Sequence, residues 1–479
     1  LSPLVDGLII SKSQKKKCEI RLNEQNKYMM DKIIGFTISK EIIDHSDIDV
    51  FKTGIRSIEL NLNGYHFYLW GINNFENCMI NSQYSLAFPA SDNLLDRNVL
   101  IEIKNSEIII QNDWLGSIPV FYNEKELIVS TLSLKTLTDR EIHPEGLANF
   151  VKSGFSILGL TPFQNVKFLR YYSKLVLTPD RMQWVSKEDP VLGENVFSCI
   201  SDEKIVSERI ETYIRNFEKC TSGEIIIPTS GGFDSRLLNL YVKDKSRIRA
   251  FSYGISDNQS ESFEVIHAKK VAEILNISWE QIKLGDYDDL MGKWFELFGI
   301  STHLHGMYQI EFYQKIFARH RFDKTATLLS GIVGDAWSGN VSIKPISTEE
   351  ELSSLSYSHG LHADVTALTI SHGYELRNRF FQKYHDYLEN EKIRIVFLIR
   401  FKLILLSYLL IVPEYFGIPT WTPFLNFDIV LGMLNLPEER RKGRQWQQDI
   451  FKKNKIDLET ITKNKDMSNT LNRQIFNRF

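Results

Sequence analysis

A short serine- and glycine-rich stretch near the middle of the chain carries residues suited to phosphate chemistry. Gly231 and Gly232 have no Cβ, so the backbone N–H groups of a turn can approach a phosphate there. Ser230 and Ser235 add hydroxyl donors. Asp234 would repel a phosphate unless a divalent cation such as Mg²⁺ lay between them. These residues predict a site for nucleotide phosphate and a metal ion, although an ordinary strand-to-helix turn with a serine cap uses similar residues.

A second stretch, 327–339, repeats the pattern of an apolar run that breaks into a turn. Ser330 and Gly331 follow the apolar run, and Asp335 comes shortly after them. Taken alone, this stretch is equally consistent with a plain loop. Together with the first turn, it predicts that two turns flank a triphosphate and that Asp234 and Asp335 hold Mg²⁺ between them.

These turns require strands that end beside each other. The β-branched run 225–227 stops at a proline, and a helix-compatible run begins at Phe233. From about residue 196 onward, apolar strands alternate with helical stretches, which is typical of a parallel sheet covered on both faces. Ligands of such sheets bind at the carboxyl ends of the strands. Ser252 and Gly254 lie at the carboxyl end of the strand expected at 248–253, so we include them in the nucleotide site.

The first part of the chain has a different pattern. Between residues 29 and 184, short alternating or apolar runs are separated by Asn, Asp and Gly, which predicts a sandwich of antiparallel strands. We expect a flexible extension at 1–28, a β-sandwich domain at 29–195 that ends in a short linker, and an α/β domain at 196–479 with a helical C-terminus. The fold class is therefore α+β followed by α/β.

The first turn resembles the pyrophosphate-binding loop, or PP-loop, of the N-type ATP pyrophosphatases, and it lacks the Gly-Lys-Ser/Thr ending of the Walker pattern. The resemblance implies that ATP is cleaved between its α and β phosphates, with AMP left on an acyl group. The second turn resembles the Ser-Gly-Glu-Gly-x-Asp-Glu stretch of asparagine synthetases. Ile332 and Ala336 stand where that stretch is acidic, and Gly334 comes one place late. These departures imply a different acceptor substrate.

The region 112–176 resembles the glutaminase-type domain of asparagine synthetases, which has an Ntn-hydrolase fold. Asp113, Gly116, Pro119 and Tyr122 keep the frame of its motif, whereas Trp114 replaces an arginine.

A working glutaminase of this kind needs an N-terminal cysteine whose free amino group activates its own thiol. Here Met29 and Met30 are followed by Asp31, and Cys78 is internal and suits a small packing residue. We therefore expect the first domain to be structural and not to release ammonia.

A basic segment near the C-terminus, 440–446, falls where the family carries a lysine that neutralises the adenylate and the leaving pyrophosphate. Lys442 or Arg444 would supply that charge as the catalytic group. A solvated basic turn at a helix end is the alternative. Upstream, Pro419 and Trp421 replace a Glu and an Arg of the family pattern, although Pro423 to Leu425 match it.

Composition excludes several other classes. The net charge of −3 does not favour a nucleic-acid partner. Four scattered cysteines suggest neither a zinc site nor a disulfide framework, which fits a cytoplasmic protein. The apolar run 403–412 is too short for a membrane span and predicts a buried helix. His303 and His305 lack a third metal ligand, so we expect a polar loop there.

These observations predict an asparagine-synthetase-like, ATP-dependent carbon–nitrogen ligase that uses ATP and Mg²⁺. It would adenylate the carboxylate of a small molecule or peptide and transfer the acyl group to ammonia or an amine, with a pathway protein as a possible partner. Two alternatives stay open. One is a glutamine-hydrolysing asparagine synthetase with amidotransferase activity, and the other is a non-catalytic nucleotide-binding partner protein.

Overall fold

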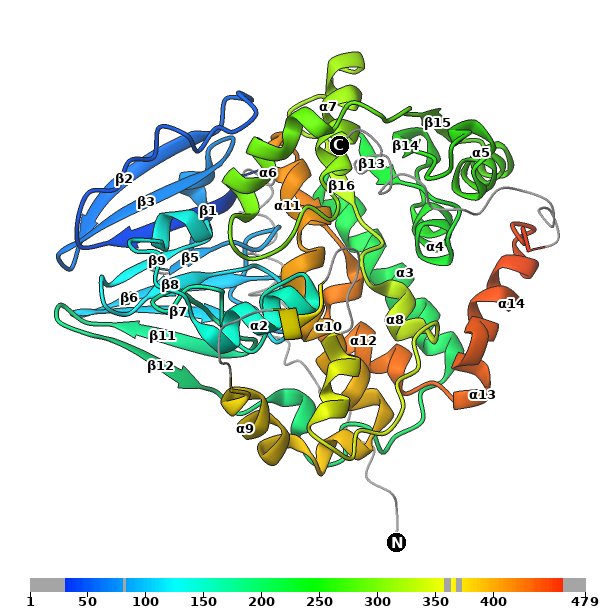
Figure 1. Ribbon diagram of the computed structural model, residues 1–479. Coiled ribbons are helices and arrows are strands. Elements are labelled where there is room, and N and C mark those ends of the chain that lie inside the picture. Colours follow the sequence, from blue (N-terminus) through cyan, green and yellow to red (C-terminus); the bar gives the residue numbers. More distant parts are fainter. Residues whose placement is uncertain (1–30, 81–82, 357–362, 368–372, 460–479) are drawn as a thin grey trace, which may run out of the picture.

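The computed structural model of the chain describes residues 31–80, 83–356, 363–367 and 373–459. The extension expected at 1–28 lies outside the described residues. A β-sandwich forms one side of the molecule and a parallel sheet with its helices forms the other. Two apolar helices, α10 (Glu391–Leu406) and α11 (Tyr408–Tyr415), run between them (Figure 1). The fold class expected from the sequence is confirmed.

The sandwich consists of two six-stranded antiparallel sheets, with the orders β10-β8-β9-β1-β3-β2 and β12-β11-β7-β6-β5-β4. The strands of the sandwich are β1 Lys32–Ser39, β2 Arg56–Leu62, β3 Tyr65–Ile72, β4 Met79–Ile80, β5 Gln83–Ser85, β6 Val99–Lys104, β7 Glu107–Asn112, β8 Phe121–Asn123, β9 Ile128–Ser130, β10 Lys167–Phe168, β11 Ser173–Leu177 and β12 Met182–Ser186.

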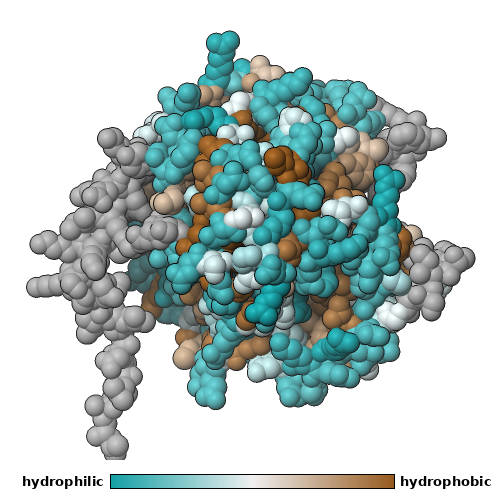
Figure 2. Space-filling model, turned by 90° about the vertical axis from the view of Figure 1, so that its left-hand side faces the viewer, coloured by the Kyte–Doolittle hydropathy of each residue, from teal (hydrophilic) through white to brown (hydrophobic). Residues whose placement is uncertain are grey.

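The core of the sandwich forms where the inward side chains of the two sheets meet. Phe36 and Phe67 come from one sheet, Ile101 and Leu175 come from the other, and all four are fully buried in one cluster. The alternation in the sequence arises because successive side chains of a strand point to opposite faces. On the outside, hydrophilic residues predominate and apolar side chains appear as patches between them (Figure 2).

The parallel sheet has the order β15-β14-β13-β16-β17. Its strands are β13 Ile225–Pro228, β14 Ile248–Ser252, β15 Ser278–Gln281, β16 Thr327–Leu329 and β17 Thr420–Trp421. The central strand, β13, is fully buried along its isoleucines, as expected for a strand covered on both faces. The carboxyl ends of β13 and β16 are neighbours, so the two glycine-containing turns meet at one edge.

Helices surround the parallel sheet and fill the C-terminal part of the chain. They are α2 Pro144–Ser153, α3 Glu203–Cys220, α4 Phe233–Tyr241, α5 Phe263–Leu275, α6 Met291–Phe298, α7 Tyr308–Arg319, α8 Gly334–Ser338, α9 Glu375–Tyr384, α10 Glu391–Leu406, α11 Tyr408–Tyr415, α12 Phe427–Leu434, α13 Glu438–Arg441 and α14 Gln445–Lys453.

The apolar run expected to be one buried helix at 403–412 is in fact shared by α10 and α11, which divide at Ser407. Among the described residues, the segment Glu391–Tyr415 is long and apolar enough to cross a membrane by length and composition, with a mean hydropathy of 2.5 in its most apolar window. That window is 83% buried inside the protein, as in the core helix of a globular fold.

The two halves are joined by buried contacts. The Trp114 indole N–H donates to the Leu425 carbonyl at 2.8 Å, so the tryptophan that replaces the family's arginine anchors the sandwich to the C-terminal half. Asp189, in the segment expected to be a linker, forms a two-pronged ion pair with Arg400 of α10 at 2.6 and 2.8 Å. The segment 187–195 is therefore fixed to the core at Asp189, and the domain boundary at residue 195 stays a prediction.

Candidate functional site

The first glycine turn connects β13 to α4 and is shaped by close packing. Gly231 has a φ of +70°, and a Cβ at this position would lie 2.1 Å from the Cβ of His267 on α5. Only glycine fits both this backbone conformation and this contact. Two serines brace the turn: the Ser230 hydroxyl accepts from the Gly232 N–H at 3.3 Å, and the Ser235 hydroxyl donates to the Gly232 carbonyl at 3.2 Å. The turn is thus preformed at the N-terminus of α4, where the helix dipole favours an anion.

Asp234 lies in the first turn of α4 and points at the second glycine turn. A Cβ on Gly334 would be 2.7 Å from the Asp234 Cγ and 2.8 Å from its Oδ1, so the second turn needs a glycine there to admit the carboxylate. The Oδ1 atom is buried and accepts no hydrogen bond from the described residues. Burial, and secondarily the nearby Asp335 carboxylate, raise the pKa of Asp234 well above its usual value, whereas Arg444 acts in the opposite direction.

Asp335 opens α8 and faces Asp234 across the gap between the two turns. Its Oδ2 accepts from the Asn340 side chain at 3.2 Å, and its backbone N–H donates to the Asp234 carboxylate. The two acids are therefore neighbours, and their role as metal ligands stays a prediction.

The two carboxylates fit a divalent cation such as Mg²⁺. Among the described residues there is no group of three or more His, Cys, Asp or Glu side chains that could hold a metal. Mg²⁺ is commonly held by one or two carboxylates together with phosphate oxygens and water. The orphaned Oδ1 of Asp234 and the repulsion between two facing acids are the features that such an ion would relieve.

The structure separates the two basic residues proposed for catalysis. Arg444 reaches the first turn, where its guanidinium lies 4.0 Å from the centre of the Phe233 ring and its charge acts on Asp234. Lys442 is exposed, and no side-chain partner is found for it among the described residues. Gly443 and Arg444 both have positive φ, and this local reversal directs Arg444 back toward the loop. Arg444 is thus the better-placed cation.

Arg236 is a further cation at the loop, and the sequence reasoning missed it. Its side chain is 1% exposed, donates to the Gly231 carbonyl at 2.8 Å and pairs with Glu459 at 3.0 Å. Because its guanidinium donates to the Gly231 carbonyl, Arg236 stabilises the conformation of the turn.

Lys402 was also missed, because it sits within an apolar helix where a core residue is expected. Its side chain is 3% exposed. Burial lowers the pKa of Lys402 to about 8, and the Asp335 carboxylate opposes that shift. Lys402 therefore approaches the acid pair from α10, on the Asp335 side, while Arg444 approaches on the Asp234 side.

Ser252 and Gly254, which the sequence predicts to bind the cofactor, are both held by neighbouring residues. Ser252 is buried at the end of β14, where its hydroxyl accepts from the Trp279 indole at 2.8 Å and donates to the Thr229 carbonyl, so its side chain is structural. Gly254 has no room for a Cβ, which would lie 2.2 Å from the Gln259 carbonyl oxygen.

The residues of the second turn also pack tightly. Ser330 accepts from the Ile332 N–H at 3.2 Å, and a Cβ on Gly331 would lie 3.1 Å from the Asp234 Cβ. Ile332 and Ala336, which replace acidic residues of the family pattern, are buried in the main hydrophobic cluster. These two side chains therefore contribute to packing and not to a polar pocket wall.

Cys78, the internal cysteine of the sandwich, is buried, and burial raises the pKa of its thiol to about 12. A thiol with such a pKa is not a nucleophile at neutral pH. This supports the interpretation of Cys78 as a packing residue.

Comparison with known proteins gives only remote likenesses. No family model matches the chain, and no curated protein matches it. Among solved structures, an NH3-dependent NAD synthetase from Campylobacter jejuni is similar at 14% identity and a TM-score of 0.22, over 40% of this chain and 80% of that one. A U34-tRNA thiolase from Methanococcus maripaludis is similar at 16% identity and a TM-score of 0.21, over 40% and 78%. Likenesses this weak assign no activity, so the chemistry rests on the site itself.

Proposed function

We propose that this chain is an ATP-dependent carbon–nitrogen ligase of the PP-loop, asparagine-synthetase-like type. A substrate carboxylate oxygen attacks the α-phosphorus of ATP, the bond to the bridging oxygen of the β-phosphate breaks, and pyrophosphate leaves. Ammonia or an amine then attacks the acyl carbon, and AMP departs with the oxygen that came from the carboxylate. The observation that carries the proposal is the meeting of Asp234 and Asp335 at two neighbouring strand ends, beside a turn shaped for an anion.

Each group at the site has a role in this reaction. The turn at 230–235 and the N-terminus of α4 hold the pyrophosphate moiety through backbone N–H groups. Arg444 stabilises the negative charge that develops on the leaving group. Asp234 and Asp335 would hold Mg²⁺, which when bound neutralises phosphate charge.

The proposed nitrogen source rests on the properties of Cys78 in the sandwich. Cys78 is buried with a raised thiol pKa, so among the described residues it does not serve as a glutaminase nucleophile. We therefore assign free ammonia or an amine as the donor, and a small molecule or peptide as the carboxylate substrate.

The experiment supplies the chain with ATP, Mg²⁺, a panel of carboxylates labelled with heavy oxygen, and either ammonium or a set of amines. Formation of AMP that carries the label, together with pyrophosphate, is the expected result. Production of ADP and phosphate, with no label in AMP, would mean that ATP is opened at the γ-phosphate and that the proposal is wrong.

A second candidate is a non-catalytic nucleotide-binding partner protein. It is favoured by one observation: Ile332 and Ala336 place apolar side chains, buried in the core, where the family has acids. This candidate predicts that ATP binds in calorimetry while no carboxylate supports AMP formation.

A further inference from the structure

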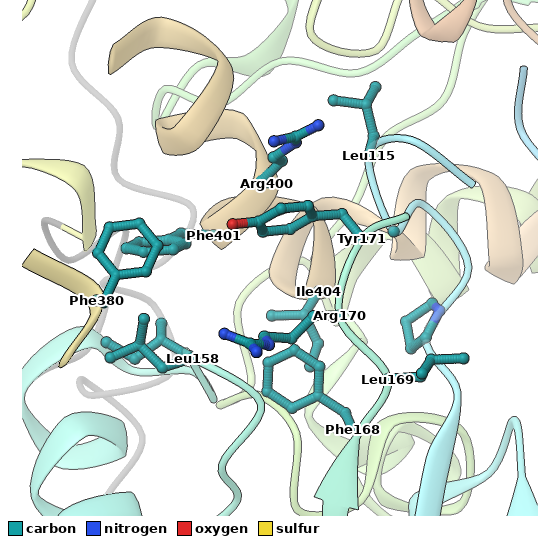
Figure 3. A pocket seen from close by; sticks show the side chains of 13 residues that line it. Leu115, Leu158, Phe168, Leu169, Arg170, Tyr171, Phe380, Arg400, Phe401 and Ile404 are labelled. Atoms are coloured by element: carbon teal, nitrogen blue, oxygen red, sulfur yellow. The ribbon is translucent and has the colours of Figure 1, made fainter. Parts of the chain in front are cut away.

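The cavity at the junction of the two halves is too small for an organic ligand. It lies between the loop around Leu115, the segment 168–171 and α10 (Figure 3), and its free space is about 20 Å³. That is room for one water molecule. Figure 3 shows the Tyr171 hydroxyl directed toward Phe380 and Phe401, and its oxygen is buried with no hydrogen-bond partner among the described residues. A water molecule fits beside this hydroxyl, whereas a substrate does not fit the space.

The first glycine turn contains a peptide unit, between Gly231 and Gly232, whose residues place few steric limits on its orientation. Neither residue carries a Cβ. In a trans peptide the C=O and N–H bonds point in opposite directions. One orientation presents the Gly232 N–H to an anion, and the other presents the Gly231 carbonyl oxygen, which repels it. The turn is therefore suited to a phosphate only when this peptide is fixed in the first orientation.

Arg236 fixes this peptide from the buried side of the turn. Its guanidinium donates to the Gly231 carbonyl at 2.8 Å, and its side chain is 1% exposed. The Gly232 N–H is directed to the other side, where it donates to the hydroxyl of the exposed Ser230 at 3.3 Å. Apart from its chain neighbours, a Cβ on Gly232 would meet the Ser230 hydroxyl and no other described atom within 4 Å. An anion can therefore approach the turn beside Gly232.

Glu459, which follows α14, is the counter-ion of Arg236. The two oxygens of its carboxylate accept from the Arg236 Nη1 at 3.0 and 3.3 Å, and the Ile456 carbonyl accepts from the same nitrogen at 3.3 Å. Burial lowers the pKa of Arg236, Glu459 opposes this shift, and the charge of Arg444 acts in the same direction as burial. A buried guanidinium without a partner destabilises a fold. The C-terminal segment therefore supplies the carboxylate that lets a buried cation stand behind the turn.

The same segment packs on the start of α4. Phe451 of α14 lies edge-on to Phe233, with the ring centres 5.2 Å apart. The Arg236 guanidinium is 4.8 Å from the centre of the Phe451 ring and 5.1 Å from that of Phe233. Arg444, which precedes α14, also lies over the Phe233 ring. The segment that brings Arg444 to the turn is thus the one that brings Glu459 to Arg236.

We propose that Arg236 and Glu459 are positioning residues for the pyrophosphate moiety of ATP: Glu459 holds Arg236 in place, and Arg236 holds the Gly231–Gly232 peptide with its N–H toward the phosphate. This inference rests on the proposed role of the turn in binding pyrophosphate. It does not require the ligase reaction, because a nucleotide-binding protein without activity needs the same peptide orientation. The segment 451–459 is then a structural part of the phosphate site.

The test is isothermal titration calorimetry of the full chain in Mg²⁺ with three probes, which are pyrophosphate, ATP and AMP. Arg236→Gln should weaken the binding of pyrophosphate and ATP by about tenfold or more, because the peptide can turn its carbonyl oxygen toward the phosphate. AMP lacks the pyrophosphate moiety and should bind within about twofold of the wild type, as expected for a contact that acts on the lost group alone. Arg236→Lys keeps a donor for the Gly231 carbonyl and should recover part of the loss.

Glu459→Gln tests the counter-ion separately. Its side chain is 35% exposed, so this variant is the milder change and gives the result if Arg236→Gln does not fold. It should weaken pyrophosphate binding by about threefold, because the pair is partly screened by solvent. The double variant Arg236→Gln/Glu459→Gln should bind pyrophosphate as Arg236→Gln does, since Glu459 acts only through Arg236.

Arg249→Gln is the matched control. It breaks the pair of Arg249 on β14 with Glu224, which lies next to the amino end of β13, whereas the turn follows its carboxyl end. This variant should bind all three probes as the wild type does. Circular dichroism and thermal unfolding verify that each variant folds.

Four results would overturn the inference: no binding of pyrophosphate by the wild type, unchanged pyrophosphate binding in Arg236→Gln, equal losses for AMP and pyrophosphate, or additive losses in the double variant. Enzymatic formation of AMP is measured separately. If the wild type forms AMP from a carboxylate and Arg236→Gln binds pyrophosphate normally, the ligase proposal stands and this inference fails. If no carboxylate yields AMP but Arg236→Gln selectively weakens ATP binding, the ligase proposal fails and this inference stands.

Discussion

At the scale of single residues, the candidate site depends on contacts that are too close to admit a Cβ at two of its glycines. Gly334 lies against the Asp234 carboxylate, and Gly231 lies against His267. Each glycine is required because a neighbouring side chain packs directly against it, and not only because of the backbone conformation of the turn. The chemistry of Asp234 therefore depends on a residue a hundred positions later in the chain.

Replacing Gly334 by alanine should displace Asp234, since the new Cβ would lie 2.7 Å from its Cγ. We expect AMP formation to fall at least about a hundredfold, as is typical when a reacting group is misplaced. The control is Gly292→Ala, at a helical glycine with open space around it, which should keep full activity and gain up to about 1 kcal/mol of stability. Equal activity of the two variants would contradict the role given to Asp234.

Arg444 and Lys442 provide a matched pair of basic residues. Arg444→Gln should lower the rate of AMP formation by about a hundredfold or more, because a charge that stabilises the leaving group is lost. Lys442→Gln should change the rate by less than about threefold, since its exposed side chain has no described partner. The measurement is the steady-state rate of AMP formation by the two variants. A larger loss in Lys442→Gln than in Arg444→Gln would assign the stabilisation of the leaving group to Lys442.

The sequence predicts the acidic residues and glycines of the candidate site, but it does not predict the basic residues that contact them. Asp234, Asp335 and the glycines could be found because strand, turn and helix signals are local. Arg236 and Lys402 could not, because their roles come from contacts made after folding, with Gly231 and Asp335. Ser252 was expected to touch the cofactor, but its hydroxyl is engaged by Trp279 and Thr229, and the sequence gives no sign of these contacts.

At the scale of elements, α10 carries three buried cations, Arg394, Arg400 and Lys402, which have different partners. Arg394 donates to the Ile343, Leu388 and Glu389 carbonyls, and Arg400 pairs with Asp189. These two arginines therefore have structural partners. The charge of Lys402 acts instead with the Asp335 carboxylate, at the candidate site.

Lys402→Met should lower the activity strongly while it changes the stability little. A methionine suits the apolar surroundings of α10, and burial already disfavours the charged form of Lys402, so urea unfolding should show a loss of no more than about 1 kcal/mol. The rate of AMP formation should fall about tenfold or more because the positive charge beside Asp335 is gone. Lys402→Arg should restore part of the rate. A large loss of stability with unchanged activity would make Lys402 purely structural.

At the scale of the whole molecule, a buried ion cluster joins the sandwich to the half that contains the parallel sheet. Glu414 of α11 pairs with Arg97 at 2.7 Å and with Lys32 of β1 at 3.3 Å, and all three side chains are almost fully buried. The two cations hold the pKa of Glu414 below its usual value in spite of its burial. The cluster ties the first strand of one half to a helix of the other.

Glu414→Gln should destabilise the protein by about 3–5 kcal/mol, because two buried cations lose their partner. Arg56→Gln, which breaks the exposed pair with Glu76, should cost less than about 1 kcal/mol. Since the folded state depresses the pKa of Glu414, its stabilising contribution is present above pH 4.5 and is lost as the pH falls below it. Urea unfolding should therefore show the gap between wild type and Glu414→Gln narrowing below that pH, and a constant gap would contradict this.

The overall architecture was predictable where the pattern is periodic. Alternation in 29–184 indicated the sandwich, and β–α alternation after 196 indicated the parallel sheet. The fifth strand, β17, was not predicted, because two residues carry no periodic signal and its pairing with β16 is formed by distant parts of the chain. For the same reason, the anchoring of Asp189 to α10 was not expected from a charged segment containing Pro and Gly.

The most direct test of the central claim is isotope exchange between pyrophosphate and ATP, with a panel of carboxylates and no amine present. Exchange measures reversible formation of the acyl adenylate and isolates the step assigned to the two turns. We predict that at least one carboxylate supports exchange and that Asp234→Ala abolishes it while the protein stays folded. Exchange that is absent with every carboxylate while ATP binds, or that persists in Asp234→Ala, would contradict the account.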